Sequence, residues 1–530
     1  MKQFKSCRFL AVLFLLLAGQ SSNTRGHDIT GYQPLGVTGF LAPFGLSSQH
    51  TYTEVWGEGD FAFLGSMSDG VAIIDVSDGT SPSFASSYHS PDLVDVSDVK
   101  SKNGIGFFAS ANGGGIHIVD ITDPIQPTRI AQLNSLAVQG FDNVSELAVE
   151  DHYLFAVSAT SPSVKVFDIS DAANPSFFRE FTTPETVGLN DIQVTDNRVY
   201  VAGLAGKDGA GAVFVYERSE VVDQSVSPTE IGRISSGSNT ASLFVNENTN
   251  HLLATQQELG GKISVWNIED ITNPNQLVAA DISEFALNSF STGEVVVDGQ
   301  IAYVAWYEAG FQILDLDNLA TDGTLQLLGG YDTSPFSNPL DGLVGNRSVF
   351  PFLGPDKVLL SDTEWGFFIV DATPALPLIG DIDGNGQLDA NDIDQLTIAI
   401  QNGNTNASLD LDGDGSVSLE DRTFLISEIM GSSFGDTNLD GSFDSTDLVR
   451  VFISGTYEDD IDFNSSWAEG DWNGDRDFSS GDLIAAFSAG NYEDTSGSQT
   501  VPEPAGILIG GILGLALHVY TYRRKRNDRD

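Results

Sequence analysis

The chain has 530 residues and is strongly acidic, because 74 Asp and Glu residues oppose 24 Lys and Arg residues and give a net charge of −50 at pH 7. This charge argues against nucleic acid or anionic lipid as a partner of the folded part. Hydrophobic residues make up 41% of the chain and include 33 Phe, which is enough for a large core and argues against disorder.

The N-terminus has the pattern of a secretory signal peptide. Lys2, Lys5 and Arg8 precede an apolar run over residues 9–18, and small polar residues follow it. The run is too short to span a bilayer, so we assign residues 1–26 to a signal peptide and predict an exported protein. Cys7 is the only cysteine and would leave with this peptide, so the mature protein would have no disulfide and no cysteine nucleophile.

Residues 27–378 contain a repeat with a period of about 45–56 residues. In each repeat a β-rich run is followed by a second apolar run that ends in an acid or amide, with Asn, Asp, Gly and Pro at the boundaries, which is typical of strands and turns. The period matches four-stranded blades, so we predict a mainly β fold, a seven-bladed β-propeller closed radially. The seven acid- or amide-ended runs are 72–75, 117–120, 165–168, 214–217, 264–267, 312–315 and 368–371.

Two further expectations follow from the repeat. The N-terminal segment 28–40 has the same turn-and-strand pattern, and we expect it to supply the missing outer strand of the last blade. Aspartates of the Asp120 type, at the ends of the runs, should fix Asx turns. The pattern, as in 117–124, resembles the LVIVD repeat and the choice-of-anchor B surface proteins over about residues 28–378. That resemblance implies an extracellular propeller and names no catalytic residue.

An acid recurs where the innermost strand of most repeats should begin. Innermost strands line the propeller axis, so these side chains should form a ring at one mouth of the channel. Such a ring is unfavourable unless cations, water or backbone N–H groups satisfy it. Two interpretations stay open: the acids cap backbone groups of the neighbouring blade, or they form a metal or acid–base site. The residues are Glu54, Asp98, Glu146, Asp191 and Glu294, with Ser242 in the fifth repeat and Asp341 a candidate in the seventh.

Four segments near the C-terminus place oxygen-bearing residues at positions 1, 3, 5, 7, 9 and 12 of an EF-hand-like loop. Calcium takes six to eight oxygen ligands in such a loop, where position 7 gives its carbonyl and Gly at position 6 allows a sharp turn. Arg476 replaces this Gly in the fourth loop, which should be the weakest. The predicted Ca²⁺ ligands are Asp381, Asp383, Asn385, Gln387, Asp389 and Asp392 in loop 1; Asp410, Asp412, Asp414, Ser416, Ser418 and Asp421 in loop 2; Asp436, Asn438, Asp440, Ser442, Asp444 and Asp447 in loop 3; and Asp471, Asn473, Asp475, Asp477, Ser479 and Asp482 in loop 4.

An apolar helical pattern follows the loops, as at Ile393, Leu396 and Ile400, and no comparable pattern precedes them, which predicts loop–helix units. These units, with Asp at position 12, resemble the dockerin type I repeat over about residues 380–490. The resemblance implies calcium binding and raises cohesin pairing as a role, although only Ser445-Thr446 matches the family's recognition residues at positions 10 and 11. Dockerins usually have two loops, so we divide the region into two pairs, 379–431 and 432–492.

The C-terminal segment 501–530 follows a linker over residues 493–500. It contains Val501-Pro502-Glu503-Pro504, an apolar stretch over 505–522 that is long enough for a transmembrane helix, and four basic residues at 523–526. This order resembles the PEP-CTERM sorting signal of bacteria, which implies recognition by an exosortase-type enzyme and removal of the helix. The alternative is a plain membrane anchor.

The sequence therefore predicts an exported calcium-binding protein of the bacterial cell surface. Its propeller would be non-enzymatic, would contain no catalytic residue, and would present a binding face for extracellular matrix, polysaccharide or a surface protein. Two other functions remain open: an extracellular hydrolase or lyase that uses the acidic channel, and an assembly module that pairs dockerin with cohesin.

Overall fold

The structure is a computed structural model that describes residues 33–41, 51–136, 142–204, 211–236, 239–247, 249–256, 261–281, 291–316, 319, 324–333 and 343–492. The chain forms two compact units, Met1–Leu376 and Pro377–Asp530. The predicted signal peptide and sorting signal lie outside the described residues. Among the helices that the structure does describe, none has the length and hydropathy needed to cross a membrane.

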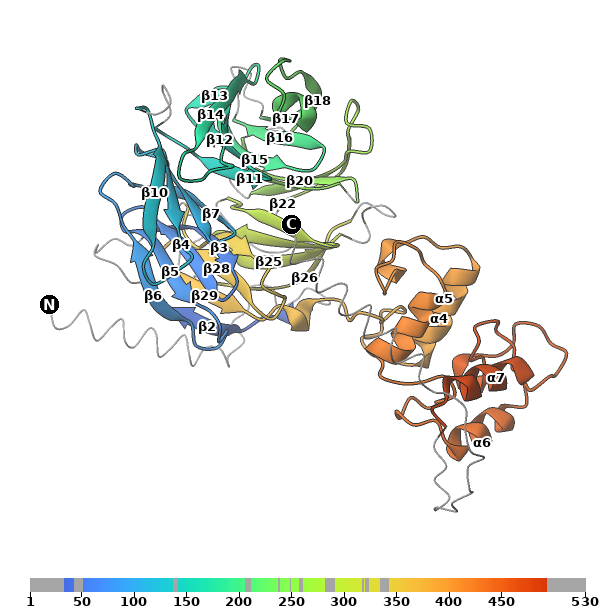
Figure 1. Ribbon diagram of the computed structural model, residues 1–530. Coiled ribbons are helices and arrows are strands. Elements are labelled where there is room, and N and C mark those ends of the chain that lie inside the picture. The colour runs from blue at the N-terminus through green and yellow to red at the C-terminus, as the bar shows by residue number, and fades with distance from the viewer. Residues whose placement is uncertain are drawn as a thin grey trace, which may run out of the picture. The chain divides into compact units, whose positions relative to one another are not determined.

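The first unit is a seven-bladed β-propeller, as predicted (Figure 1). In each blade consecutive strands pair antiparallel, and the first strand contacts the first strand of the next blade, so these first strands surround the axis. Blades one to three are β3 (Tyr52–Glu58), β4 (Phe61–Ser66), β5 (Gly70–Asp75) and β6 (Ser83–Tyr88); β7 (Val96–Lys102), β8 (Ile105–Ser110), β9 (Ile116–Asp120) and β10 (Thr128–Leu133); and β11 (Glu146–Glu150), β12 (Tyr153–Ser158), β13 (Ser161–Asp168) and β14 (Ser176–Thr182).

The remaining blades repeat this arrangement. They are β15 (Leu189–Val194), β16 (Arg198–Gly203), β17 (Ala212–Glu217) and β18 (Glu230–Ser235); β19 (Thr240–Asn246), β20 (His251–Gln256), β21 (Lys262–Asn267) and β22 (Asn275–Asp281); β23 (Val295–Asp298), β24 (Ile301–Trp306), β25 (Gly310–Asp315) and β26 (Gln326–Tyr331); and β27 (Asn346–Phe350), β28 (Val358–Asp362) and β29 (Gly366–Val370), which β2 completes. A short helix, α2 (Arg218–Val221), follows β17.

The N-terminal strands close the ring. β2 (Val37–Leu41) pairs antiparallel with β29 and is the outer strand of the seventh blade. β1 (Gln33–Pro34) pairs parallel with β26 of the sixth blade. The expectation that this segment completes the last blade is confirmed, and pairing with β2 removes an exposed sheet edge.

Apolar side chains from adjacent blades fill the spaces between the sheets. One cluster joins the first two blades through Phe63 and Val71 on one side and Val99 and Phe108 on the other. The acid at the end of four runs fixes an Asx turn, as predicted for residues of the Asp120 type: Asp120 Oδ1 accepts hydrogen bonds from the backbone N–H (3.0 Å) and hydroxyl (2.6 Å) of Thr122. The same hydrogen bond, from the backbone N–H two residues later to the aspartate Oδ1, occurs at Asp75, Asp168 and Asp371.

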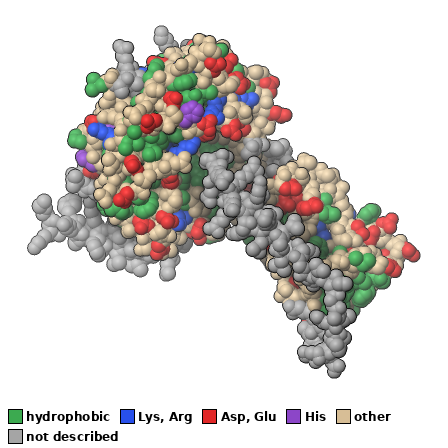
Figure 2. Space-filling model, viewed as in Figure 1, with side chains coloured by type: hydrophobic (Ala, Val, Ile, Leu, Met, Phe, Trp, Pro, Cys, Tyr) green, Lys and Arg blue, Asp and Glu red, His purple; other side chains and the backbone are tan. Residues whose placement is uncertain are grey.

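The second unit consists of loop–helix segments, as predicted. The helices α4 (Ala390–Gln401), α5 (Leu419–Phe424), α6 (Ser445–Ser454) and α7 (Ser480–Ala489) each follow one of the four predicted loops, and a π-helical turn over Leu425–Ile429 continues α5. Residues from all four segments share one apolar core, which includes Ile393, Leu425, Val451 and Ala486. Acidic side chains are spread over the visible surface of both units (Figure 2).

Candidate functional site: an acidic channel and four acidic loops

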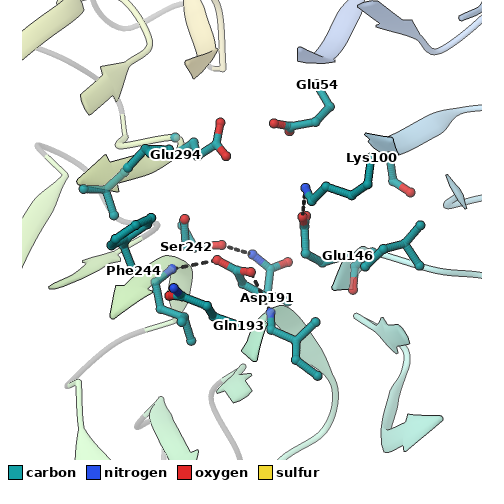
Figure 3. Close-up of a pocket in the computed structure, with 18 of the residues that line it drawn as sticks. Glu54, Lys100, Glu146, Asp191, Gln193, Ser242, Phe244 and Glu294 are labelled. Carbon is teal, nitrogen blue, oxygen red and sulfur yellow. Dashed lines mark hydrogen bonds and ion pairs between the residues drawn. The ribbon is translucent and has the colours of Figure 1, made fainter. Parts of the chain in front are cut away.

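The acidic residues of the propeller meet at one cavity on its axis, which has a volume of about 610 Å³. Glu54, Glu146, Asp191, Ser242 and Glu294 line it from five blades, on or directly before the first strand. Figure 3 shows Glu54, Glu294 and Lys100 pointing toward one another across this space. The cavity also has aromatic walls, formed by Trp56, Phe244, Tyr307, Phe350 and Phe352.

The seventh blade contributes a serine to this ring. In β27 the strand register shifts between Asn346 and Ser348, as it shifts between Val96 and Asp98 in β7, so Ser348 holds the position of the ring acid. Its hydroxyl donates to Glu54 Oε1 (2.5 Å) or Glu294 Oε2 (2.7 Å). The candidate at Asp341 lies outside the described residues, before β27 begins.

Three ring acids join their blade to the next one. The second carboxylate oxygen of Asp98 accepts from Leu147 N–H of the third blade (2.8 Å). Asp191 accepts from Leu243 N–H of the fifth blade (2.7 Å), and Glu294 accepts from a backbone N–H of the seventh (3.0 Å). The capping interpretation therefore holds for these three residues.

Sequence reasoning missed the cation of the channel, Lys100. This residue lies on β7 two positions after Asp98, and side chains two apart on a strand share one face. Its Nζ lies 2.6 Å from Asp98 Oδ1, 2.7 Å from Glu146 Oε1 and 5.0 Å from the Trp56 ring centroid. Burial alone would lower the pKa of Lys100, but the surrounding carboxylates raise it well above its ordinary value, so the ammonium is charged.

One lysine does not neutralise the ring. Burial, with the negative charge of Asp98, raises the pKa of Glu146 well above its ordinary value. Burial and the charge of Glu54 do the same to the pKa of Glu294, and burial raises the pKa of Asp191 to about 6. These carboxylates therefore hold protons more tightly than free ones, and the channel favours any positive charge that can reach it.

The first three acidic loops share one backbone geometry. In loop 1 the position-1 residue Asp381 accepts from the backbone N–H groups of Asn385 (3.0 Å) and Gly386 (2.7 Å). Asp392 at position 12 accepts from Ile382 N–H (2.7 Å) and Asp389 N–H (2.8 Å), which ties the two ends of the loop together. Loops 2 and 3 repeat all four bonds through Asp410, Asp421, Asp436 and Asp447.

The following helix fixes the last part of each loop. Position 9 is the N-cap and position 12 is the third helical residue, and together they form a capping box. The position-9 side chains of Asp389, Ser418, Asp444 and Ser479 accept from the backbone two residues on. An ion in the loop would therefore reach position 9 through water, which is common at this position.

The carboxylates converge in a way that suits a hard cation. In loop 1 the ligand oxygens of Asp381, Asp383 and Asp392 all lie within 4.8 Å of one another, and Asp410, Asp412 and Asp421 do the same in loop 2. In loop 4 the converging set is Asp471, Asp475 and Asp482. Loop 3 has Asn438 at position 3 and keeps the shared backbone geometry. These oxygen donors fit Ca²⁺.

Loop 4 departs from the others where the sequence predicted it would. Arg476 adopts φ +70°, the left-handed conformation in which the position-6 glycines of the other loops lie without strain. Asp471 accepts from Gly474 N–H at position 4 (2.8 Å), and burial raises the pKa of Asp471 to about 6. The side chain of Asp477 at position 7 accepts from Phe463 N–H (2.6 Å) and is committed to that segment.

Comparison with known proteins identifies the repeat. The family model described as "LVIVD repeat" matches residues 53–90 and 291–333, which correspond to the first and sixth blades. The chain contains LVIVD repeats. No curated protein matches it.

Solved structures similar to the chain include the computationally designed Ika8 protein (14% identity, 62% of this chain and 98% of that chain, TM-score 0.42). Another is U3-55K (14% identity, 61% of this chain and 96% of that chain, TM-score 0.45). A third is the structure of the WD40 repeats of RRP9 (14% identity, 64% of this chain and 99% of that chain, TM-score 0.44).

Proposed function

We propose that this LVIVD-repeat protein is an exported, calcium-binding protein of the bacterial cell surface, in which a non-enzymatic propeller presents a binding face to extracellular matrix or polysaccharide. The signal-peptide pattern at the N-terminus supports export, and the 501–530 segment supports exosortase processing or membrane attachment. Calcium would order the second unit.

The observation that carries calcium binding is the loop geometry repeated in the second unit. Position-1 and position-12 aspartates turn their carboxylates toward the same point, although each already accepts backbone N–H groups. Three carboxylates within 4.8 Å repel one another unless a cation lies among them. Bound Ca²⁺ would offset this repulsion and hold the position-12 aspartate in the first turn of each helix, so binding free energy would become folding free energy.

Calcium titration of the full mature chain tests this proposal. We expect Asp410→Asn and Asp436→Asn each to remove one binding site, because each replaces a position-1 carboxylate. Glu428→Gln is the matched control, since it removes one negative charge from an exposed residue outside the loops. Equal calcium uptake by all three variants and the parent would contradict the assignment.

The binding role of the propeller calls for a separate experiment. The mature chain, saturated with calcium, would be applied to an array of bacterial polysaccharides and matrix proteins. Selective retention on the array with no turnover of the retained ligand is the expected result. Turnover of a retained polysaccharide would favour the hydrolase or lyase alternative, and retention on cohesin alone would favour assembly through the exposed Ser445 and Thr446 at the start of α6.

A further inference from the structure

Carboxyl groups in the propeller channel outnumber the basic side chains that form ion pairs with them in the described part of the chain. Ionised carboxylates only accept hydrogen bonds, and five carboxyl groups surround the axis. Lys100 satisfies Asp98 and Glu146 on one side. Within the described part of the chain neither Glu54 nor Glu294 forms an ion pair with a basic side chain, although Arg347 also lines the cavity.

Glu54 and Glu294 form a second carboxylate pair that resembles the one around Lys100. The Ser348 hydroxyl lies within hydrogen-bond distance of both, 2.5 Å from Glu54 Oε1 and 2.7 Å from Glu294 Oε2, so the two carboxylates lie close together. Tyr307 and Phe350 line the same cavity. Lys100 shows which group such a pair accepts: an ammonium between two carboxylates that lies over an aromatic ring.

The size and walls of the cavity decide between a bare ion and an organic molecule. A volume of about 610 Å³ lies in the range of small-molecule sites and is far larger than a single ion needs. Its aromatic walls give it apolar surface that a bare metal ion cannot use. A ligand with an ammonium group and a short carbon skeleton would satisfy both the carboxylates and the walls.

We propose that the propeller channel is a binding site for a small organic cation that carries a primary ammonium group. The ammonium lies between Glu54 and Glu294, opposite Lys100, and the carbon skeleton contacts the aromatic side chains. This site is separate from the calcium loops and does not depend on them.

Calorimetric titration of the full mature chain at constant saturating calcium tests the site with putrescine, a diamine, and with 1,4-butanediol, its uncharged counterpart. We expect putrescine to bind at least tenfold more tightly than the diol. Glu294→Gln should weaken putrescine binding about tenfold, because it replaces a charged acceptor by a neutral amide. Glu269→Gln, an equal charge change at an exposed turn after β21, should leave it unchanged.

Two further measurements keep the test decisive. Glu54→Gln, which changes the other carboxyl group of the pair, should weaken putrescine binding about tenfold if Glu294→Gln fails to fold. Asp410→Asn should not alter putrescine binding, so that failure of the calcium loops is distinguished from failure of the channel site. Equal binding of diamine and diol, undiminished binding by both channel variants, or uptake of a divalent cation in place of the amine would overturn the proposal.

Discussion

Removing the ammonium of Lys100 is the sharpest test of how the propeller tolerates its acidic channel. Lys100→Met keeps most of the side-chain volume and removes the charge that lies 2.6 Å from Asp98 and 2.7 Å from Glu146. The two carboxylates come from adjacent blades, so the substitution replaces an attraction between the blades by a repulsion. We expect the propeller to lose stability and to keep its fold.

The magnitude follows from the burial of the three side chains. Breaking a buried ion pair by removing one partner typically costs about 3–5 kcal/mol. The side chain of Asp98 is fully buried, while those of Lys100 and Glu146 keep 13% and 19% exposure, so water screens part of the loss. We therefore expect about 3 kcal/mol, the lower end of that range. At an unfolding entropy of about 2.1 cal/mol/K per residue, the melting temperature of a body as large as the propeller would fall by roughly 4 °C.

Calorimetric melting at pH 8 in saturating calcium measures this loss. Lys102→Met is the comparison variant, because Lys102 lies on the same strand and lines the same cavity but forms no ion pair within the described residues. Adding Glu146→Gln to Lys100→Met should recover part of the stability, since the amide removes the remaining repulsion. If Lys100→Met and Lys102→Met melt at the same temperature, or if adding Glu146→Gln restores no stability, the ammonium of Lys100 is not what offsets the repulsion among the ring carboxylates.

Three other predictions concern the rest of the molecule. Asp120→Ala should lower the urea midpoint of the propeller more than Asp120→Asn, because the amide keeps an acceptor for Thr122; equal midpoints would contradict the Asx-turn role. Arg422 is buried in the second unit and donates to the Trp472 carbonyl (2.9 Å) and to the Asp471 carbonyl (2.7 Å). Arg422→Met should therefore lower the free energy of unfolding of that unit by at least about 3 kcal/mol, as measured by chemical denaturation. An unchanged unfolding transition would refute this. The pKa of Asp191 is raised by burial to about 6 in the folded state, so its contribution to stability is present at low pH and is lost as the pH rises through 6. The melting temperature of the parent relative to Asp191→Asn should therefore be higher at pH 5 than at pH 8, and an equal difference at the two pH values would contradict this.

The structural features that the sequence predicted are those whose residues recur at a fixed spacing along the chain. Runs that end in an acid or amide recur once per blade, and in four of them the acid fixes the turn after the third strand, as Asp120 does. The apolar pattern after the calcium loops likewise predicted helices there, and the capping boxes show how they begin: the position-12 carboxylate satisfies the backbone at the helix N-terminus.

Features that depend on contacts between distant residues could not be found in this way. Lys100 acts on Glu146, which lies 46 residues later, and nothing local marks that pair. The seventh ring position is held by Ser348, a residue type that a search for recurring acids passes over, although β27 has the same register shift as β7. The sequence did contain one signal for Lys100 as a channel residue: it lies two positions after the ring acid Asp98, and side chains two apart on a strand share a face.

The two acidic clusters of the chain pose the same physical problem, and the protein meets it in different ways. In the channel, backbone N–H groups of neighbouring blades satisfy Asp98 and Asp191, and Lys100 supplies a fixed positive charge from within the fold. In the loops, the backbone N–H groups bind Asp381 and Asp392 in the same manner, but the converging oxygens remain within 4.8 Å of one another. If the loops bind calcium, as we propose, that ion is the counterpart of Lys100. Substituting Lys100 and chelating calcium are thus equivalent perturbations, because each removes the cation that offsets a group of carboxylates. Substituting Lys100 should lower the melting temperature of the propeller alone. Chelating calcium should lower the melting temperature of the loop–helix unit alone.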